Sequence, residues 1–95
     1  MSGDGLSERT VEIVNRAGMH ARPAAELVKL AGTFAADIRL EKDGMEVNGK
    51  SIMGVLMLAA EQGSALTIRA RGDDAEEAVE ALSALVGRGF DEVEA

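Results

Sequence analysis

The 95-residue sequence contains no cysteine, tryptophan or tyrosine, and only one proline and one histidine. Without cysteine there can be no disulfide framework, and a chain of this length forms one domain with a core large enough for folding. No apolar run reaches the about 20 residues that a membrane-spanning helix needs, and the first residues lack the features of a secretory signal. We therefore expect a cytoplasmic protein that makes no contact with membranes.

Positive charge is also scarce, since 10 Lys and Arg residues stand against 17 Asp and Glu residues, which gives a formal net charge of −7. This balance argues against nucleic acid as a partner, since phosphate contacts need a positive surface. The excess of acid is confined to residues 72–95, which carry eight acidic side chains against Arg88 alone. A solvated helix face followed by an acidic tail over residues 90–95 is the expected arrangement for this quarter of the chain.

Hydrophobic periodicity predicts seven elements of secondary structure after a Gly- and Ser-rich segment, residues 1–7, which we expect to be disordered. Alternation of apolar and polar residues predicts four strands: 8–14, 36–41, 45–47 and 66–71. Helical spacing predicts three helices: 21 to about 31, 52 to about 57, and a third whose buried stripe runs from Ala75 to Leu85 and which Gly87 and Gly89 close. Lys42-Asp43-Gly44 is a hairpin signal between the second and third strands.

Three residues mark the expected helix ends. Gly32 suits a left-handed residue after the first helix, and Ser51 suits the N-cap of the second helix. Asp73, followed by an acidic residue three positions later, resembles the capping box of the third helix.

The resulting order is βαββαβα, with one apolar face on each strand. That pattern predicts an α+β open-faced β-sandwich, in which three helices cover one face of a four-stranded antiparallel sheet. We expect this domain to span residues 8–89 and to be a monomer.

His20, the single histidine, lies at the predicted N-terminus of the first helix. Pro23 fits the first turn, where its missing N–H costs nothing. The free N–H groups and the positive end of the helix dipole favour an anion beside His20 and disfavour an imidazolium. Since a neutral imidazole nitrogen can attack phosphorus, and Arg22 can donate charge-assisted hydrogen bonds to phosphoryl oxygens, this pattern favours phosphoryl chemistry.

Other interpretations of His20 are a solvated turn residue or an ordinary helix cap. A metal site is disfavoured, because zinc needs three or four ligands and no second histidine or well-spaced carboxylate accompanies His20. A Ser-His-Asp hydrolase is disfavoured too, because the loop has no nearby nucleophile and the chain is too short for a walled cleft. We predict no metal and no cofactor.

The second predicted helix belongs to an unbroken apolar run, residues 52–60, which leaves it no polar face. Such a helix is either buried all round or meets a partner on one side. In the second case three residues pack inward and three point outward: Val55, Leu58 and Ala59 inward, and Ile52, Met53 and Leu56 outward. Methionine is common on adaptable contact surfaces, but the pattern alone leaves core and docking roles open.

Two sequence motifs, taken together with this order of elements, resemble those of one known family. The motifs are Gly18-Met19-His20-Ala21-Arg22-Pro23-Ala24 and Lys50-Ser51-Ile52-Met53-Gly54. The family is HPr, the histidine-containing phosphocarriers of the bacterial phosphoenolpyruvate-dependent phosphotransferase system, and the resemblance runs from about Glu8 to Val86. It implies a relay in which His20, through Nδ1, receives a phosphoryl group from enzyme I and passes it to an enzyme IIA domain in sugar uptake. Arg22 corresponds to the site arginine.

The resemblance also implies that Ser51 is a regulatory site for an ATP-dependent HPr kinase/phosphorylase, with a serine that only caps the helix as the alternative. The implied docking surface contains Ile52, Met53 and Leu56 together with Ala25, and Lys29 and Lys50 add positive charge. Ala17 departs from the family pattern at a position where a hydrogen-bonding Ser or Asn is frequent, so support for the histidine from that side is missing.

Two further functions stay open. One is a regulatory paralogue of the nitrogen-related branch, which signals by phosphorylation-dependent binding without sugar transport. The other is an inert module in which His20 never reacts. Because His20 is expected in each case, its presence cannot separate them.

Overall fold

The computed structural model describes residues 5–92, which form four strands and three α-helices in the predicted order, followed by a short 3-10 helix. The strands are β1 (Leu6–Glu12), β2 (Asp37–Lys42), β3 (Met45–Asn48) and β4 (Ala65–Arg71). The helices are α1 (Ala21–Ala31), α2 (Ile52–Met57), α3 (Ala75–Gly87) and the 3-10 helix η1 (Gly89–Asp91).

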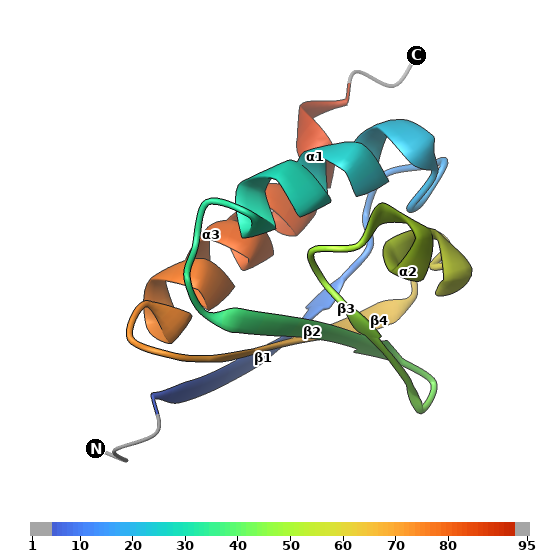
Figure 1. The fold of residues 1–95 in the computed structure, drawn as a ribbon. Helices are drawn as coiled ribbons and strands as arrows, with labels where there is room; N and C mark the ends of the chain where they lie inside the picture. Colours follow the sequence, from blue (N-terminus) through green and yellow to red (C-terminus); the bar gives the residue numbers. More distant parts are fainter. Residues whose placement is uncertain (1–4, 93–95) are drawn as a thin grey trace.

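The strands form one sheet in the order β1-β4-β2-β3, with every neighbouring pair antiparallel. The three α-helices lie on one side of this sheet (Figure 1), which confirms the predicted open-faced sandwich. None of the described helices is long and apolar enough to cross a membrane.

The core lies between the sheet and the helices. On the central strands, Ile38, Leu40, Leu66 and Ile68 are fully buried and meet helix residues such as Leu27. These strand residues are two positions apart, so they share the helix-facing side of the sheet, as the alternation predicts.

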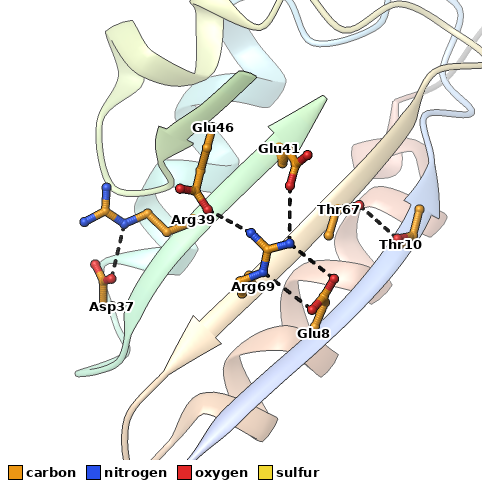
Figure 2. Close-up of polar contacts among 8 residues, drawn as sticks. All are labelled: Glu8, Thr10, Asp37, Arg39, Glu41, Glu46, Thr67 and Arg69. Atoms are coloured by element: carbon orange, nitrogen blue, oxygen red, sulfur yellow. Dashed lines mark hydrogen bonds and ion pairs between the residues drawn. The ribbon is translucent and has the colours of Figure 1, made fainter. Parts of the chain in front are cut away.

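The opposite face of the sheet is polar, and Arg69 of β4 connects its strands through hydrogen bonds (Figure 2). Its guanidinium donates to Glu46 at 2.8 Å, Glu41 at 3.2 Å and Glu8 at 3.3 Å, so one side chain links all four strands. These hydrogen bonds raise the pKa of Arg69, and the bond to Glu8 has the largest effect, followed by the bond to Glu41. An antiparallel sheet can keep one polar face in contact with water while its apolar face packs against helices.

The first strand begins earlier than the sequence pattern predicts. Leu6 and Ser7 belong to β1 and pair with Arg71 and Ala70 of β4, whereas we predicted a disordered segment up to residue 7. Pairing with a distant strand overrides the local Gly- and Ser-rich composition. The strand also ends at Glu12 and not at residue 14, and residues 1–4 of the predicted extension lie outside the described residues.

Two predicted helix ends are wrong in detail. Gly32 has a φ of −67°, which is right-handed, so it is not the left-handed residue that we expected. The N-cap of α3 is Asp74 and not Asp73, and its carboxylate does not cap its own helix. Instead Asp74 accepts hydrogen bonds from the backbone N–H groups of Ala35 at 2.8 Å and Ala36 at 2.9 Å, and so ties the start of α3 to the entry of β2.

The predicted boundary between domain and acidic tail also needs correction. Phe90 is only 3% exposed and packs into the core, and Glu92 makes hydrogen bonds to residues near the start of α1. The domain therefore continues past residue 89 to the end of the described chain at Glu92. Residues 93–95 of the predicted tail lie outside the described residues.

Candidate functional site

His20 is the N-cap of α1, as the sequence predicts, and its side chain is 42% exposed. Its backbone carbonyl accepts from the N–H of Ala24, but its imidazole makes no capping hydrogen bond to the helix. The first N–H groups of a helix have no intrahelical acceptor, and here the cap residue leaves them uncovered. Pro23 stands third in α1, where it has no N–H to satisfy. An anion beside His20 would meet these donors and the positive end of the helix dipole.

The loop before His20 is fixed against the segment that follows α2. Met19 is buried, and its backbone N–H donates to the carbonyl of Ala60 at 2.8 Å. Gly18 has a φ of +69°, and a Cβ there would stand only 2.6 Å from the same carbonyl oxygen. This position therefore requires glycine, both for the left-handed backbone and for the close approach.

Sequence reasoning missed two residues that hold the histidine, Asn15 and Glu92. His20 Nε2 lies 2.9 Å from Glu92 Oε2, and Asn15 Nδ2 donates to Glu92 Oε1 at 3.0 Å and to the carbonyl of Gly18 at 2.8 Å. Figure 1 shows the red end of the described chain beside the pale blue start of α1. Glu92 thus supports the histidine from the C-terminal segment, which we had assigned to an acidic tail.

Arg22 is exposed on the first turn of α1 and lines an open depression together with Arg16 and Glu92. Arginine presents several donors in a planar fork that matches phosphoryl oxygens. The structure therefore brings Arg22 to the surface where we predicted a phosphoryl group, and it adds Arg16 as a second basic residue that we did not predict.

The exposed side of α2 is apolar, as predicted for a docking surface, but its membership differs. Ile52 and Met53 are 39% and 67% exposed, whereas Leu56 is half-buried and packs against the core. Met57, which we did not assign, is 65% exposed and lies four residues after Met53 on the same helical face. Val55 and Leu58 are buried as predicted, but Ala59 is exposed and follows the end of the helix with a φ of +49°.

Ser51 is the N-cap of α2, and its Oγ accepts a hydrogen bond from the N–H of Gly54 at 3.2 Å. A Cβ at Gly54 would lie 3.3 Å from Val47 Cβ, so glycine there lets α2 pack closely on β3. The six residues of α2 span about 9 Å, and the His20 loop contacts the segment after its far end. Ser51 and His20 therefore lie at opposite ends of α2.

The remaining predicted residues are Ala25 and Lys29 on α1, and Lys50, whose side chain reaches the segment after α1. Ala25 is exposed one turn after the histidine, and Lys29 is exposed in the last turn of the helix. Lys50 Nζ donates to the carbonyl of Phe34 at 2.7 Å, just past the C-terminal end of α1. The structure thus separates the two lysines from His20 by much of the helix, so they can act on a docked partner and not directly on a phosphoryl group.

The family model described as the PTS HPr component phosphorylation site matches residues 7–88. The chain belongs to the HPr family. It is 45% identical to the phosphocarrier protein HPr of Cupriavidus necator over 94% of this chain and 100% of the relative. It is also 47% identical to the phosphocarrier protein NPr of Proteus mirabilis, over 88% of this chain and 94% of NPr. The crystal structure of HPr-C-His from Thermoanaerobacter tengcongensis superimposes with a TM-score of 0.89 at 46% identity, covering 93% of this chain and 99% of that one.

Some HPr relatives form dimers. The crystal structure of Crh from Bacillus subtilis is a swapped dimer, and it resembles this chain with a TM-score of 0.71 and 47% identity over 83% of this chain and 91% of Crh. Our expectation of a monomer therefore does not follow from family membership. Within residues 5–92, no three or more His, Asp or Glu side chains are grouped so that they could hold a metal ion.

Proposed function

We propose that this HPr-family phosphocarrier accepts a phosphoryl group on His20 from enzyme I and transfers it to enzyme IIA domains in sugar uptake, in the cytoplasm. The observation that carries this proposal is the position of His20, an exposed histidine at a helix N-terminus whose first N–H groups it leaves uncovered. A histidine that served only as a cap would direct its side chain to those groups.

The chemistry is a relay between protein partners. A ring nitrogen of His20 attacks phosphorus, and the oxygens of the transferred group meet the free N–H groups of α1 and the guanidinium of Arg22. The exposed position suits the relay, because donor and acceptor must each approach the phosphorus in line. In this proposal magnesium and phosphoenolpyruvate belong to enzyme I, and the carrier itself needs no cofactor.

The partners dock on the apolar side of α2, which carries Ile52, Met53 and Met57. We call these three residues the α2 surface. It adjoins the His20 loop through the segment that follows α2, and Ala25 extends it along α1. Lys29 and Lys50 lie at its far side and favour an acidic partner. A small surface of this kind suits a carrier that must leave each partner quickly.

Ser51 is the proposed regulatory site, phosphorylated by an HPr kinase/phosphorylase. A phosphate there would add roughly two negative charges beside Ile52 and Met53. These charges would repel an acidic face of enzyme I and slow the loading of His20, although Ser51 lies at the far end of α2. The alternative, a serine that only caps α2, rests on its hydrogen bond with Gly54.

A regulatory paralogue is the second candidate function. Its support is that NPr and Crh resemble this chain as closely as the HPr of Cupriavidus necator does, with identities of 47%, 47% and 45%. Such a protein would also accept a phosphoryl group on His20, but it would signal by binding and not by onward transfer.

The experiment that separates these functions follows the phosphoryl group after loading. The chain is loaded with enzyme I, magnesium and labelled phosphoenolpyruvate, purified, and mixed with sugar-specific enzyme IIA domains. The relay predicts that the label moves to a histidine of the acceptor within the mixing time. Label that stays on the carrier with every sugar-specific acceptor tested would reject the sugar-uptake role and favour the regulatory one.

A further inference from the structure

Glu92 makes a side-chain contact with His20 that the relay chemistry above does not use. Glu92 Oε2 lies 2.9 Å from His20 Nε2, and the glutamate side chain is only 17% exposed. Its other oxygen accepts from Asn15 Nδ2 at 3.0 Å. The carboxylate is therefore held from both sides, and one of its oxygens is directed at a single nitrogen of the imidazole ring.

The amide of Asn15 has only one workable orientation in this arrangement. Its nitrogen faces the carbonyl oxygen of Gly18 and the carboxylate of Glu92, and both groups are acceptors. The amide oxygen is buried and has no hydrogen-bond partner among residues 5–92. An unsatisfied buried polar atom is costly, so the two bonds that the Asn15 nitrogen makes must offset that cost.

The backbone before Glu92 is strained. Gly89, Phe90 and Asp91 have φ values of +67°, +59° and +57°, and two of the three are not glycine. Left-handed conformations are costly for such residues and concentrate at functional positions. Phe90 is buried in the core, which anchors the turn and directs the following residue back to the start of α1.

We propose that Glu92 is a positioning residue that holds the proton of His20 on Nε2 and leaves the lone pair of Nδ1 free for attack on phosphorus. An ionised carboxylate can only accept hydrogen bonds, so the ring nitrogen that faces it must carry the proton. In neutral imidazole the other nitrogen is then the unprotonated one. This inference rests on the proposed function, because it names the residue that prepares the same histidine for attack through Nδ1.

The same contact acts during transfer. The Nδ1 lone pair forms the new N–P bond, the bond from phosphorus to the donor breaks, and its electron pair leaves with the donor. The proton on Nε2 stays in place, so the ring becomes cationic as the N–P bond forms. The carboxylate of Glu92 stabilises that developing charge from the side opposite the phosphoryl group.

Glu92→Gln tests this role because Asn15 also fixes the orientation of the new amide. Asn15 Nδ2 needs an acceptor, so the Gln oxygen occupies that side and the Gln NH2 group faces His20 Nε2. A donor at that place selects the tautomer with the proton on Nδ1, which cannot attack. Ring 15N shifts of His20 in the unphosphorylated protein, recorded at about pH 8.5, about two units above the ordinary pKa of free histidine, report the tautomer directly.

We expect the wild-type protein to show the Nε2–H tautomer, Glu92→Gln to shift toward Nδ1–H, and Glu92→Ala to show a mixture. Loading by enzyme I should be about tenfold slower in Glu92→Gln, the scale of one hydrogen bond to a charged group, with an unchanged melting temperature. Glu80→Gln is the matched control, because Glu80 is exposed on α3 and does not line the depression beside Arg22, and it should load at the wild-type rate.

Wild-type 15N shifts in Glu92→Gln would overturn the proposal, and so would an equal loss of rate in Glu80→Gln, which would make the effect one of net charge. The tautomer measurement needs neither partner nor phosphate. If the wild-type protein is never phosphorylated on His20, the proposed function fails while the 15N shifts still decide the role of Glu92.

Discussion

The starts of α1 and α2 differ in what the cap residue does with the free N–H groups of its helix. Ser51 covers one of them, because its Oγ accepts from the N–H of Gly54. His20 covers none and turns its imidazole to Glu92. A helix N-terminus closed by its own cap is a structural joint, whereas one left open can receive an anion. The difference indicates α1, and not α2, as the place for a phosphoryl group before any modification.

The start of α3 gives a third arrangement. Asp74 occupies the N-cap position, yet its carboxylate binds Ala35 and Ala36 and not its own helix. The hydrogen bond from Ala35, the largest cause, lowers the pKa of Asp74 below its ordinary value of 3.8. An acidic residue at a cap position can therefore serve tertiary structure instead of the helix.

Loss of Arg22 should have the largest effect at the open N-terminus of α1. Arg22→Ala should slow loading by enzyme I, by about a hundredfold if its guanidinium acts as one preorganised donor to the transferred group. Stability should change by less than about 0.5 kcal/mol, since the side chain is exposed. Stopped-flow loading rates and thermal unfolding measure the two effects. Arg39→Ala removes an exposed arginine from the opposite face of the sheet, and an equal loss of rate there would contradict a local role for Arg22.

A charge on the α2 surface should weaken docking and leave the fold intact. Met53→Glu should reduce binding to enzyme I by about tenfold or more, the effect of losing an interface anchor, while the melting temperature changes little. Calorimetric titration measures the affinity. Met45→Glu is the control, because Met45 is an exposed methionine on β3 outside the α2 surface. Unfolding of Met53→Glu would show that this residue belongs to the core.

A charge at the cap of α2 should have a smaller effect. Ser51→Asp should load about fivefold more slowly than Ser51→Asn, since a charge costs about 1 kcal/mol against a like charge at close range in water. Both replacements cap helices well, so their melting temperatures should equal or exceed that of the wild type. Equal loading rates for the two variants would leave Ser51 as a cap and nothing more.

The tertiary role of Asp74 should appear only in acid. Because its pKa is lowered in the folded state, its contribution to stability is present above pH 3.8 and is lost as the pH falls from there through the folded pKa. Unfolding free energies measured between about pH 5 and pH 2 should therefore fall less steeply for Asp74→Asn than for the wild type. Asp73→Asn, at the neighbouring position first predicted to be the cap, should follow the wild-type curve.

The sequence predicts those parts of the molecule that depend on local patterns. The bounds of α1 and α2 agree with the apolar spacing. Ser51 is recognisable as a cap because a serine immediately before an apolar run favours the N-cap position. The predicted start of β1 and the predicted cap of α3 were wrong, because each of these features depends on a partner far along the chain. Leu6 pairs with Arg71, and Asp74 binds Ala35, contacts for which no neighbouring residue gives a signal.

The candidate site divides in the same way. His20 and Arg22 are recognisable because the proline and the helix pattern surround them. Glu92 lies 72 residues from His20 and was assigned to a solvated tail. The available signal was Phe90, a large apolar residue after two glycines, which indicates a return of the chain to the core. Met57 could have been found from its spacing to Met53, which places both on one face of α2.

Direct phosphorylation of His20 is the measurement that tests the central claim. The protein is incubated with enzyme I, magnesium and phosphoenolpyruvate, and then analysed by intact mass before and after brief acid treatment. The account predicts one added phosphoryl group that acid removes, because a phosphorus–nitrogen bond is acid-labile and a phosphoserine is not. The group should map to His20 and be absent from His20→Ala. Phosphorylation that persists in His20→Ala, or that survives acid in the wild type, would contradict the account.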